Sequence, residues 1–266
     1  MTSGHCCLIT LLTDFGTADW FVGTMKGVIA ALAKDTRVID LTHEVPPGDI
    51  RAGAFSLKAA YRFFPQGTVH VAVVDPGVGS NRRAIAVQTA DYFFVGPDNG
   101  LLSWALRNEK VKSIRSVENA DYFLRPISST FHGRDIFAPV AAHLSSGVPL
   151  AKIGPAQDDL VRVPWPSPKA TRRGIQGQIL YFDRFGNAIT NLDSASLRAR
   201  GHSRIKIRVR GKLVCCLATH YHAVPPGKPV AMIGSTDLLE IAINEGRAVE
   251  QLKLRLSDLV TAELDI

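Results

Sequence analysis

An apolar run that ends abruptly in a glycine-rich loop is the feature that most constrains the fold. Residues 69–74 read VHVAVV, and the next six, DPGVGS, contain a proline and two glycines that cannot continue a strand. An apolar run of this length is typical of a strand that is buried on both faces of a parallel sheet. Asp75 is therefore expected at the carboxyl end of a strand, where open α/β sheets bind their ligands.

Three further segments combine glycine with a carboxylate in a similar way. They are 13–16 (TDFG), which ends another apolar run, 96–100 (GPDNG) and 131–135 (FHGRD). The carboxyl ends of parallel strands lie along one edge of a sheet, so the loops that follow them can meet there. The four segments together predict one site at one edge of a sheet.

Strand-like and helix-like segments alternate through the first part of the chain. From the spacing of apolar residues we expect strands over 6–12, 37–41, 69–74, 84–88 and 92–95, and helices over 20–34, 49–64, 101–107 and 136–144. Asp49 and Asp135 are the expected N-caps of the second and fourth helices. This order predicts an α/β fold with a mainly parallel sheet covered by helices.

The character of the sequence changes after residue 160. Residues 161–173 are rich in proline and basic residues, which is typical of a linker. Beyond them, short alternating runs over 177–183, 204–209, 213–218, 229–233 and 249–256 predict a small antiparallel β domain. The expected organisation is an N-terminal α/β domain over 1–160, a linker over 161–173 and a C-terminal β domain over 174–266.

Composition and charge argue against several classes of protein. The chain of 266 residues is 46% hydrophobic and 21% charged, which fits a globular protein, and no apolar segment approaches the ~18 residues that cross a bilayer. The net charge is +7, but the basic residues are scattered and no recognition motif accompanies them, which argues against nucleic-acid binding. The four cysteines form two vicinal pairs without metal-ligand spacing, and free thiols favour a cytoplasmic location.

Asp75, Arg82 and His132 are the residues best suited to acid–base chemistry. An arginine beside an aspartate keeps that carboxylate ionised. Such a carboxylate can orient and polarise a water molecule, while a histidine shares or relays the proton. Each residue alone fits a purely structural role equally well, as a turn-former, a surface charge or a loop histidine. Their common place in or beside glycine-bearing loops favours a shared site.

Asp14 and Asn187 suit the recognition of a nucleoside. The two oxygens of Asp14 can accept hydrogen bonds from both hydroxyls of a ribose. The amide of Asn187, in the turn 183–187 (DRFGN), offers a donor and an acceptor to an adenine edge. An Asx-turn at Asp14 and a simple hairpin turn at Asn187 are the structural alternatives.

Several familiar signatures are absent from the sequence. It contains no Walker loop, no G-x-G-x-x-G motif after a strand and no H-E-x-x-H motif. The His-Gly-Arg-Asp segment has a superficial likeness to a kinase catalytic loop, but the rest of the kinase signature is missing. A conventional phosphate cradle, a zinc protease site and a kinase are therefore not supported.

Taken together, the motifs resemble those of the S-adenosyl-L-methionine (SAM) hydrolases, the hydroxide adenosyltransferase branch related to the SAM-dependent fluorinases and chlorinases. The resemblance extends from about residue 8 to 250, over the segments 13–16, 74–82, 96–101, 130–135, 182–187 and 234–242. It implies an N-terminal α/β domain, a C-terminal antiparallel β-barrel-like domain, and a homotrimer with active sites between subunits.

The reaction that this resemblance implies is attack of water or hydroxide on the ribose 5′ carbon, giving adenosine and methionine. A sulfonium leaves as a neutral thioether, so the step needs no general acid, no metal and no cofactor, only an aligned and partly desolvated oxygen. The resemblance assigns Asp75, Arg82 and His132 to water activation. Arg83 is adjacent to Arg82, but the family spacing from Asp75 favours Arg82.

The resemblance also implies a substrate-binding set. It places Asp14 on the ribose diol, Asn187 on the adenine and Asp183 near the methionine ammonium, and Phe131 lines the nucleoside pocket. The remaining members of the expected set are Phe15, Asp19, Asn99, Tyr221, Ser235 and Glu240.

Asp75 and His132 favour hydrolysis over halide transfer, because the halogenating relatives have a tyrosine in place of the former and lack the latter. Three alternatives remain open on the sequence alone. They are a SAM-dependent halogenase of the same fold, an adenosine-binding module with negligible turnover, and a metal-dependent hydrolase.

Overall fold

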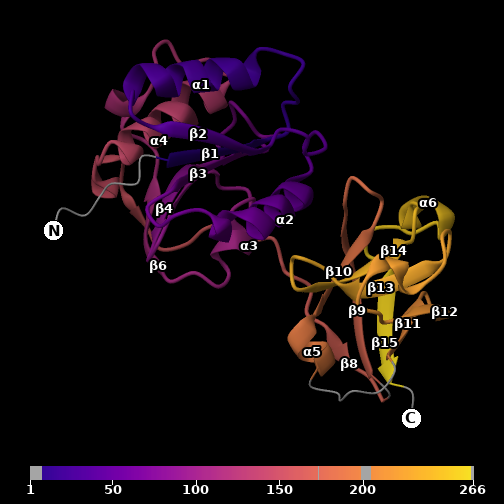
Figure 1. Cartoon of the computed structure of the whole chain (residues 1–266). Coiled ribbons are helices and arrows are strands. Elements are labelled where there is room, and N and C mark those ends of the chain that lie inside the picture. The colour runs from indigo at the N-terminus through magenta and orange to yellow at the C-terminus, as the bar shows by residue number, and fades with distance from the viewer. Residues whose placement is uncertain (1–7, 173, 199–204, 265–266) are drawn as a thin grey trace. The chain divides into compact units, whose positions relative to one another are not determined.

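The computed structural model describes residues 8–172, 174–198 and 205–264. The chain divides into two compact units, Met1–Pro164 and Trp165–Ile266 (Figure 1). The division falls inside the proline-rich segment. Cys6 and Cys7, which belong to the first expected strand, lie outside the described residues.

The first unit is built on a seven-stranded mixed sheet with the strand order β2-β1-β3-β5-β4-β6-β7. Strands β2, β1, β3 and β5 are parallel to one another, whereas β4, β6 and β7 add antiparallel pairings. The strand bounds are β1 Leu8–Thr13, β2 Arg37–Thr42, β3 Val69–Val73, β4 Ala84–Thr89, β5 Phe93–Pro97, β6 Val111–Ser116 and β7 Ala156–Gln157. The predicted α/β class is confirmed, and the parallel half of the sheet carries the loops singled out above.

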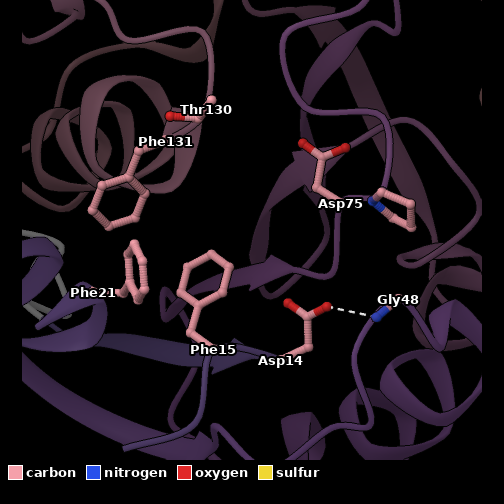
Figure 2. A pocket seen from close by; sticks show the side chains of 8 residues that line it. Asp14, Phe15, Phe21, Gly48, Asp75, Thr130 and Phe131 are labelled. Atoms are coloured by element: carbon pink, nitrogen blue, oxygen red, sulfur yellow. Dashed lines mark hydrogen bonds between the residues drawn. The ribbon is translucent and has the colours of Figure 1, made fainter. Parts of the chain in front are cut away.

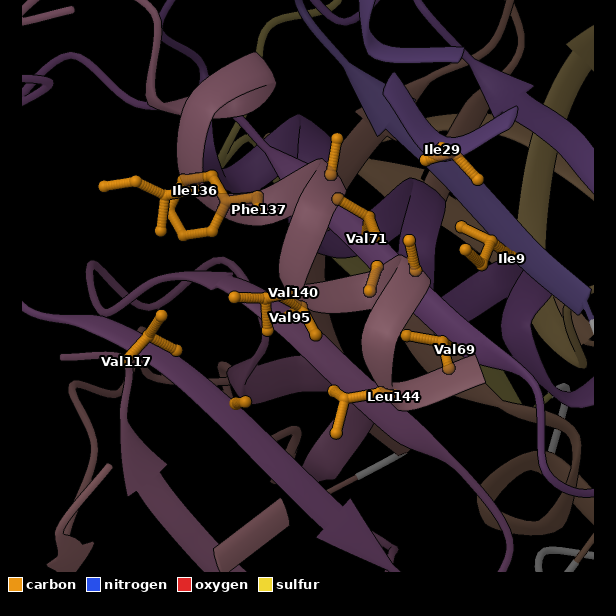
Figure 3. Packing of buried hydrophobic residues seen from close by; sticks show 14 of the residues in the cluster. Ile9, Ile29, Val69, Val71, Val95, Val117, Ile136, Phe137, Val140 and Leu144 are labelled. Atoms are coloured by element: carbon orange, nitrogen blue, oxygen red, sulfur yellow. The ribbon is translucent and has the colours of Figure 1, made fainter. Parts of the chain in front are cut away.

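Helices cover both faces of this sheet (Figure 1). Helices α1 (Phe21–Leu32) and α4 (Ala138–Ser145) lie on one face, and α2 (Ile50–Ala60) and α3 (Ser103–Leu106) on the other. The α1 and α4 side packs a continuous core that includes Ile29, Val71 and Leu144 (Figure 3). Because both faces are covered, every residue of β1 and β3 is buried, which explains their unbroken apolar pattern.

One of the two predicted helix caps is confirmed and the other is wrong. Asp49 caps α2, because its Oδ1 accepts a hydrogen bond from the Ala52 N–H at 2.9 Å. Asp135 does not cap α4: a π-helical turn, η3 (Gly133–Phe137), already includes it. Its carboxylate is fully buried and bonds Arg134 and the Ser128 N–H, so it organises the preceding loop instead.

The second unit is an antiparallel sheet with the order β12-β11-β15-β9-β10-β14-β13, and β8 pairs with β9. The two ends of this sheet approach each other, because the Ala218 N–H donates to Ala231 O of β13 at 2.7 Å beside a bridge from Leu217. The sheet is therefore barrel-like and nearly closed. Its strands are β8 Lys169–Ala170, β9 Gly174–Phe182, β10 Ala188–Asp193, β11 Ile205–Val209, β12 Lys212–Cys216, β13 Pro229–Ile233, β14 Leu238–Ile243 and β15 Leu259–Leu264.

The strand predicted over 249–256 is wrong. Residues Ala248–Gln251 form helix α6, and Lys253 follows with a φ of 49°, a left-handed turn that no strand contains. The strands β8, β10, β14 and β15 were not predicted. The remaining short helices are α5 Ser194–Arg198, η1 Tyr61–Phe63, η2 Ala120–Tyr122, η4 Leu150–Lys152 and η5 Tyr221–Ala223.

Candidate functional site

A cavity of about 360 Å³ opens in the first unit where three of the four predicted loops meet; the 96–100 loop contributes no lining residue. Figure 2 shows the carboxylates of Asp14 and Asp75 on one side of this space and a group of phenylalanine rings on the other. The lining residues are Asp14, Phe15, Phe21, Gly48, Asp75, Pro76, Thr130 and Phe131. They come from the ends of β1 and β3, from the start of α1, and from the loops before α2 and η3.

Asp75, Arg82 and His132 form a connected group at this cavity. The Arg82 Nε lies 3.0 and 2.9 Å from the two carboxylate oxygens of Asp75, and its Nη2 donates to Oδ2 at 2.5 Å. The same Nη2 lies 2.8 Å from Nδ1 of His132. Only 5% of the Asp75 side chain and 12% of the Arg82 side chain are exposed, so this ion pair is shielded from solvent. A single guanidinium thus joins the carboxylate to the imidazole.

The hydrogen bond from Arg82 determines which nitrogen of His132 carries a proton. A guanidinium can only donate, so Nδ1 is the acceptor, and the proton of the neutral ring is on Nε2. Burial, and next the positive charge of Arg82, lower the pKa of His132 below its usual value, against two neighbouring carboxylates. The neutral Nε2–H form is therefore the ground state at neutral pH.

Gly79 allows the two loops of this group to approach each other. Its φ is +77°, and a Cβ at this position would lie 2.2 Å from the main-chain oxygen of Ser129. No other residue fits so close to the 128–132 backbone. The glycine of the 75–80 loop therefore brings Asp75 and Arg82 within reach of His132, which is 50 residues away from Arg82 in the sequence.

Arg83 has other partners. Its Nε donates to Oδ2 of Asp98 at 2.8 Å, and its Nη2 bonds Asp159 at 3.0 Å. The alternation of side chains along the chain sends Arg82 and Arg83 in different directions. Asp75 is consequently paired with Arg82. Arg83 instead connects Asp159 to Asp98, which directly follows β5.

Three phenylalanines form the apolar wall of the cavity. The ring centroids of Phe15, Phe21 and Phe131 lie 5.2–5.9 Å apart, with Phe131 edge-on to the other two. Arg134 lies over the Phe131 ring at 5.2 Å. Apolar rings opposite two carboxylates suit a ligand that has both a flat face and hydroxyl or cationic groups.

Asp14 is fixed by one of its oxygens. The Gly48 N–H donates to Asp14 Oδ2 at 2.8 Å, as the dashed line in Figure 2 marks. The other oxygen has no hydrogen-bond partner among the described residues. Phe21, Gly48, Pro76 and Thr130 also line the cavity but were not in the predicted set. Gly48 contributes a main-chain N–H, which leaves no signal in the sequence.

Four predicted residues of the first unit are not among those that line the cavity: Asp19, Arg82, Asn99 and His132. Asp19 is exposed in the loop before α1. Asn99 holds the main chain: its Nδ2 donates to Val74 O at 2.8 Å, and its Oδ1 accepts from the Leu101 N–H at 3.1 Å. Asn99 thus ties the 97–101 turn to the end of β3, next to Asp75.

The predicted residues of the second unit form two hydrogen-bonded pairs. Asp183 accepts bonds from the main-chain N–H and the side-chain Nδ2 of Asn187, at 2.8 and 3.0 Å, across the turn between β9 and β10. The Tyr221 hydroxyl donates to Oε1 of Glu240 at 2.6 Å. Burial raises the pKa of Glu240, the bond from Tyr221 opposes this, and the charge of Asp183 adds to it. Ser235 is exposed in the turn before β14.

Comparison with known protein families identifies the family of this chain. The SAM hydroxide adenosyltransferase N-terminal domain matches residues 9–154, and the C-terminal domain of the same family matches residues 177–261. The chain belongs to this family. The (R)-S-adenosyl-L-methionine hydrolase of Salinispora tropica is 43% identical to it over 253 residues, covering 94% of this chain and 95% of the relative.

A solved structure agrees with the family assignment. The crystal structure of a conserved protein from Thermotoga maritima superposes with a TM-score of 0.90 at 36% identity, covering 96% of this chain and 99% of the other. The SAM hydroxide adenosyltransferase match spans both units, so the family accounts for the α/β sheet and for the nearly closed β sheet.

The described residues contain no group of three or more histidine, cysteine, aspartate or glutamate side chains placed to hold a metal ion. Within the same part of the chain, no helix combines the length and the apolar character that crossing a membrane requires.

Proposed function

We propose that this protein hydrolyses SAM to adenosine and L-methionine, with water as the nucleophile at the ribose 5′ carbon. The observation that carries the proposal is the shielded Asp75–Arg82–His132 group beside a cavity that also presents Asp14 and an aromatic wall. Relatives named (R)-S-adenosyl-L-methionine hydrolase, at 35–43% identity over most of the chain, support it.

The chemistry requires an oriented oxygen and a place for its proton. The sulfonium departs as a neutral thioether, so the leaving group needs no protonation. Asp75, which Arg82 holds by hydrogen bonds to both carboxylate oxygens, accepts a hydrogen bond from the attacking water and takes its proton as the C–O bond forms and the C–S bond breaks. His132 offers its Nε2–H to the same region, because its Nδ1 lone pair is engaged by Arg82. In this scheme His132 orients the water and Asp75 is the base.

The substrate-binding roles remain those expected from the resemblance. In this proposal Asp14 holds the ribose diol with its unpartnered oxygen, and Phe15 and Phe131 border the nucleoside. Asn187 binds the adenine, and Asp183 lies near the methionine ammonium. Asp19, Asn99, Tyr221, Ser235 and Glu240 complete the proposed set.

The stereochemistry of the sulfonium refines the proposal. The relatives' names specify the (R) epimer at sulfur. We propose the same preference for this protein, so that it removes the (R) epimer and spares the (S) epimer.

Halide transfer is the second candidate, because the fluorinase of Actinoplanes is 27% identical over 287 residues. A nearly buried carboxylate at Asp75 disfavours it, because this carboxylate repels an anionic nucleophile at the place where it can accept a hydrogen bond from water. Neutral water meets no such repulsion.

Three further properties belong to the proposal on the strength of the resemblance. They are a homotrimer with active sites between subunits, a cytoplasmic location, and activity without a metal or cofactor. Size-exclusion chromatography with light scattering tests the first, and activity in EDTA tests the last.

The decisive experiment is incubation of the purified protein with (R)-SAM and with (S)-SAM, in EDTA, followed by chromatography of adenosine and methionine. The matched variant is Asp75→Asn, which keeps the shape and removes the charge. We expect adenosine from the (R) epimer, and a decrease in kcat of about 10³-fold in the variant. Adenosine that binds without being formed would support the binding module, and 5′-chloro-5′-deoxyadenosine in chloride would support the halogenase.

A further inference from the structure

A buried histidine that the proposed chemistry does not use lies directly behind the Asp14 turn. His43 follows β2, and only 3% of it is exposed. Burial of a polar ring is unfavourable unless its nitrogens find partners, so the contacts of His43 show what it holds in place.

His43 makes hydrogen bonds to the 13–16 turn at two points. Its Nδ1 lies 2.8 Å from the Thr13 hydroxyl, and its main-chain oxygen accepts the Gly16 N–H at 2.8 Å. The Thr13 hydroxyl oxygen in turn accepts the Phe15 N–H at 3.2 Å. The turn that carries Asp14 is therefore fixed on both sides by one residue.

The direction of these bonds forms a consistent relay. The Thr13 oxygen accepts from Phe15, and its own proton can be donated to His43 Nδ1; in that arrangement the ring carries a proton on Nε2. That Nε2 makes no hydrogen bond of good geometry, but it lies 3.1 Å from Oδ1 of Asp40.

The outer end of the relay is an ionised pair. Burial disfavours the charge on Asp40, but the hydrogen bond from Lys26 and the adjacent imidazole of His43 outweigh it and hold the pKa of Asp40 below its usual value. The Lys26 Nζ lies 2.6 Å from Asp40 Oδ2. The chain of contacts thus leads from the Lys26–Asp40 ion pair at the surface, through His43, to Thr13 at the cavity wall.

The same segment also orients the carboxylate of Asp14. Gly48, five residues after His43, donates its N–H to Asp14 Oδ2 at 2.8 Å. One segment, 43–48, therefore fixes both the main chain of the Asp14 turn and one of its carboxylate oxygens. The other oxygen is left for a ligand.

We propose that His43 is a positioning residue that, through Thr13, sets the Asp14 carboxylate to receive the vicinal diol of a ribose. The inference rests on the proposed function, because it takes Asp14 as the diol acceptor. Loss of this positioning should weaken the binding of the ribose diol and leave the contacts to the rest of the nucleoside unchanged.

The chain contains a matched control for this arrangement. Thr10 and His70 form the same hydroxyl-to-Nδ1 pair at 2.7 Å, and both residues are fully buried. Thr10 lies three residues before Thr13 on β1, but neither member of this pair lines the cavity. Replacing each threonine by valine removes the same hydroxyl and preserves the volume.

The test is calorimetric binding of adenosine and of 2′,3′-dideoxyadenosine to the wild type, His43→Leu, His43→Asn, Thr13→Val and Thr10→Val. We expect His43→Leu and Thr13→Val to bind adenosine about tenfold more weakly, which is the scale of one impaired hydrogen bond to a charged group. Their affinity for the dideoxy compound should change less than twofold. His43→Asn places an acceptor near the position of Nδ1 and should recover most of the loss, and Thr10→Val should bind both ligands as the wild type does.

An equal loss for both ligands, or no loss in Thr13→Val, would overturn the inference. A wild type that binds the two compounds equally would overturn it as well, because Asp14 would then hold no diol. Failure of the proposed function would give a different result. No adenosine would form from SAM, but the protein would still prefer adenosine to the dideoxy compound, and this preference would still depend on His43.

Discussion

Replacing Arg82 by lysine keeps a positive charge beside Asp75 but removes the planar group that connects this carboxylate to His132. A lysine Nζ ends about where the arginine Cζ lies, one C–N bond of about 1.3 Å short of Nη2. The 2.8 Å contact between Nη2 and His132 Nδ1 would lengthen to about 4 Å, which is beyond hydrogen-bond range.

The expected loss of activity follows from these contacts. A hydrogen bond from a charged donor contributes about 1.5–3 kcal/mol, and here it holds the ring that orients the water. Loss of about 2 kcal/mol from the transition state corresponds to a decrease in kcat of about thirtyfold. KM should change little, because Arg82 bonds Asp75 and His132 and lies over the Phe137 ring at 5.3 Å, away from the nucleoside contacts.

The assay is adenosine formation from SAM at saturating substrate, with the free energy of unfolding measured in parallel. Arg83→Lys is the matched control, because Arg83 pairs with the buried carboxylate of Asp98 and takes no part in the Asp75 group. It should lose stability and keep kcat within about threefold of the wild type. If Arg82→Lys also stays within threefold, the connection through the guanidinium is not what orients the nucleophile.

Two further predictions concern stability. Gly79→Ala should lower the free energy of unfolding by about 3 kcal/mol and lower kcat, because the new Cβ would collide with Ser129 O. The control is Gly211→Ala, at a φ of +79° with nothing within 4 Å, which should lower the free energy of unfolding by only about 1 kcal/mol and leave the activity unchanged. Burial lowers the pKa of His70 from 6.5 to about 3, so its contribution to stability should be nearly constant above about pH 7.5. Stability should then fall by about 2.5 kcal/mol between pH 7 and 4.5 as the unfolded chain takes up a proton. The double variant Thr10→Val/His70→Leu should lose that slope in urea titrations at the two pH values, and an unchanged slope would assign it to other groups.

The sequence predicted the first unit well, because strands buried on both faces must be apolar throughout. The run at 69–74 illustrates this: all of β3 is buried, and the loop after it could be placed at the sheet edge without coordinates. The second unit was predicted less well. Residues 249–256 alternate apolar and polar side chains like a strand, but tertiary contacts turn the chain there into α6 and a left-handed residue.

The predicted site shows the same division. Asp75 and Arg82 lie in one loop, so their proximity could be expected from local sequence. The residue types alone do not distinguish Arg82 from Arg83; the family spacing favours Arg82, and the structure pairs Arg82 with Asp75 and Arg83 with Asp98. Asp135 was expected as a cap because caps are predicted from local sequence, whereas the structure places Asp135 inside a π-helical turn with its carboxylate bonded to Arg134 and to the Ser128 N–H.

What the sequence determined by itself is the set of chemical groups and the loops that carry them, since hydrophobic pattern, glycine and proline act over a few residues. What only the tertiary structure decided is the contact between groups far apart in the chain. His132 reaches Arg82 across 50 residues, and Thr13 meets His43 across 30. Such contacts form only when the loops and strands of the sheet pack together. A main-chain donor such as the Gly48 N–H cannot be predicted from residue types, because every residue except proline has one.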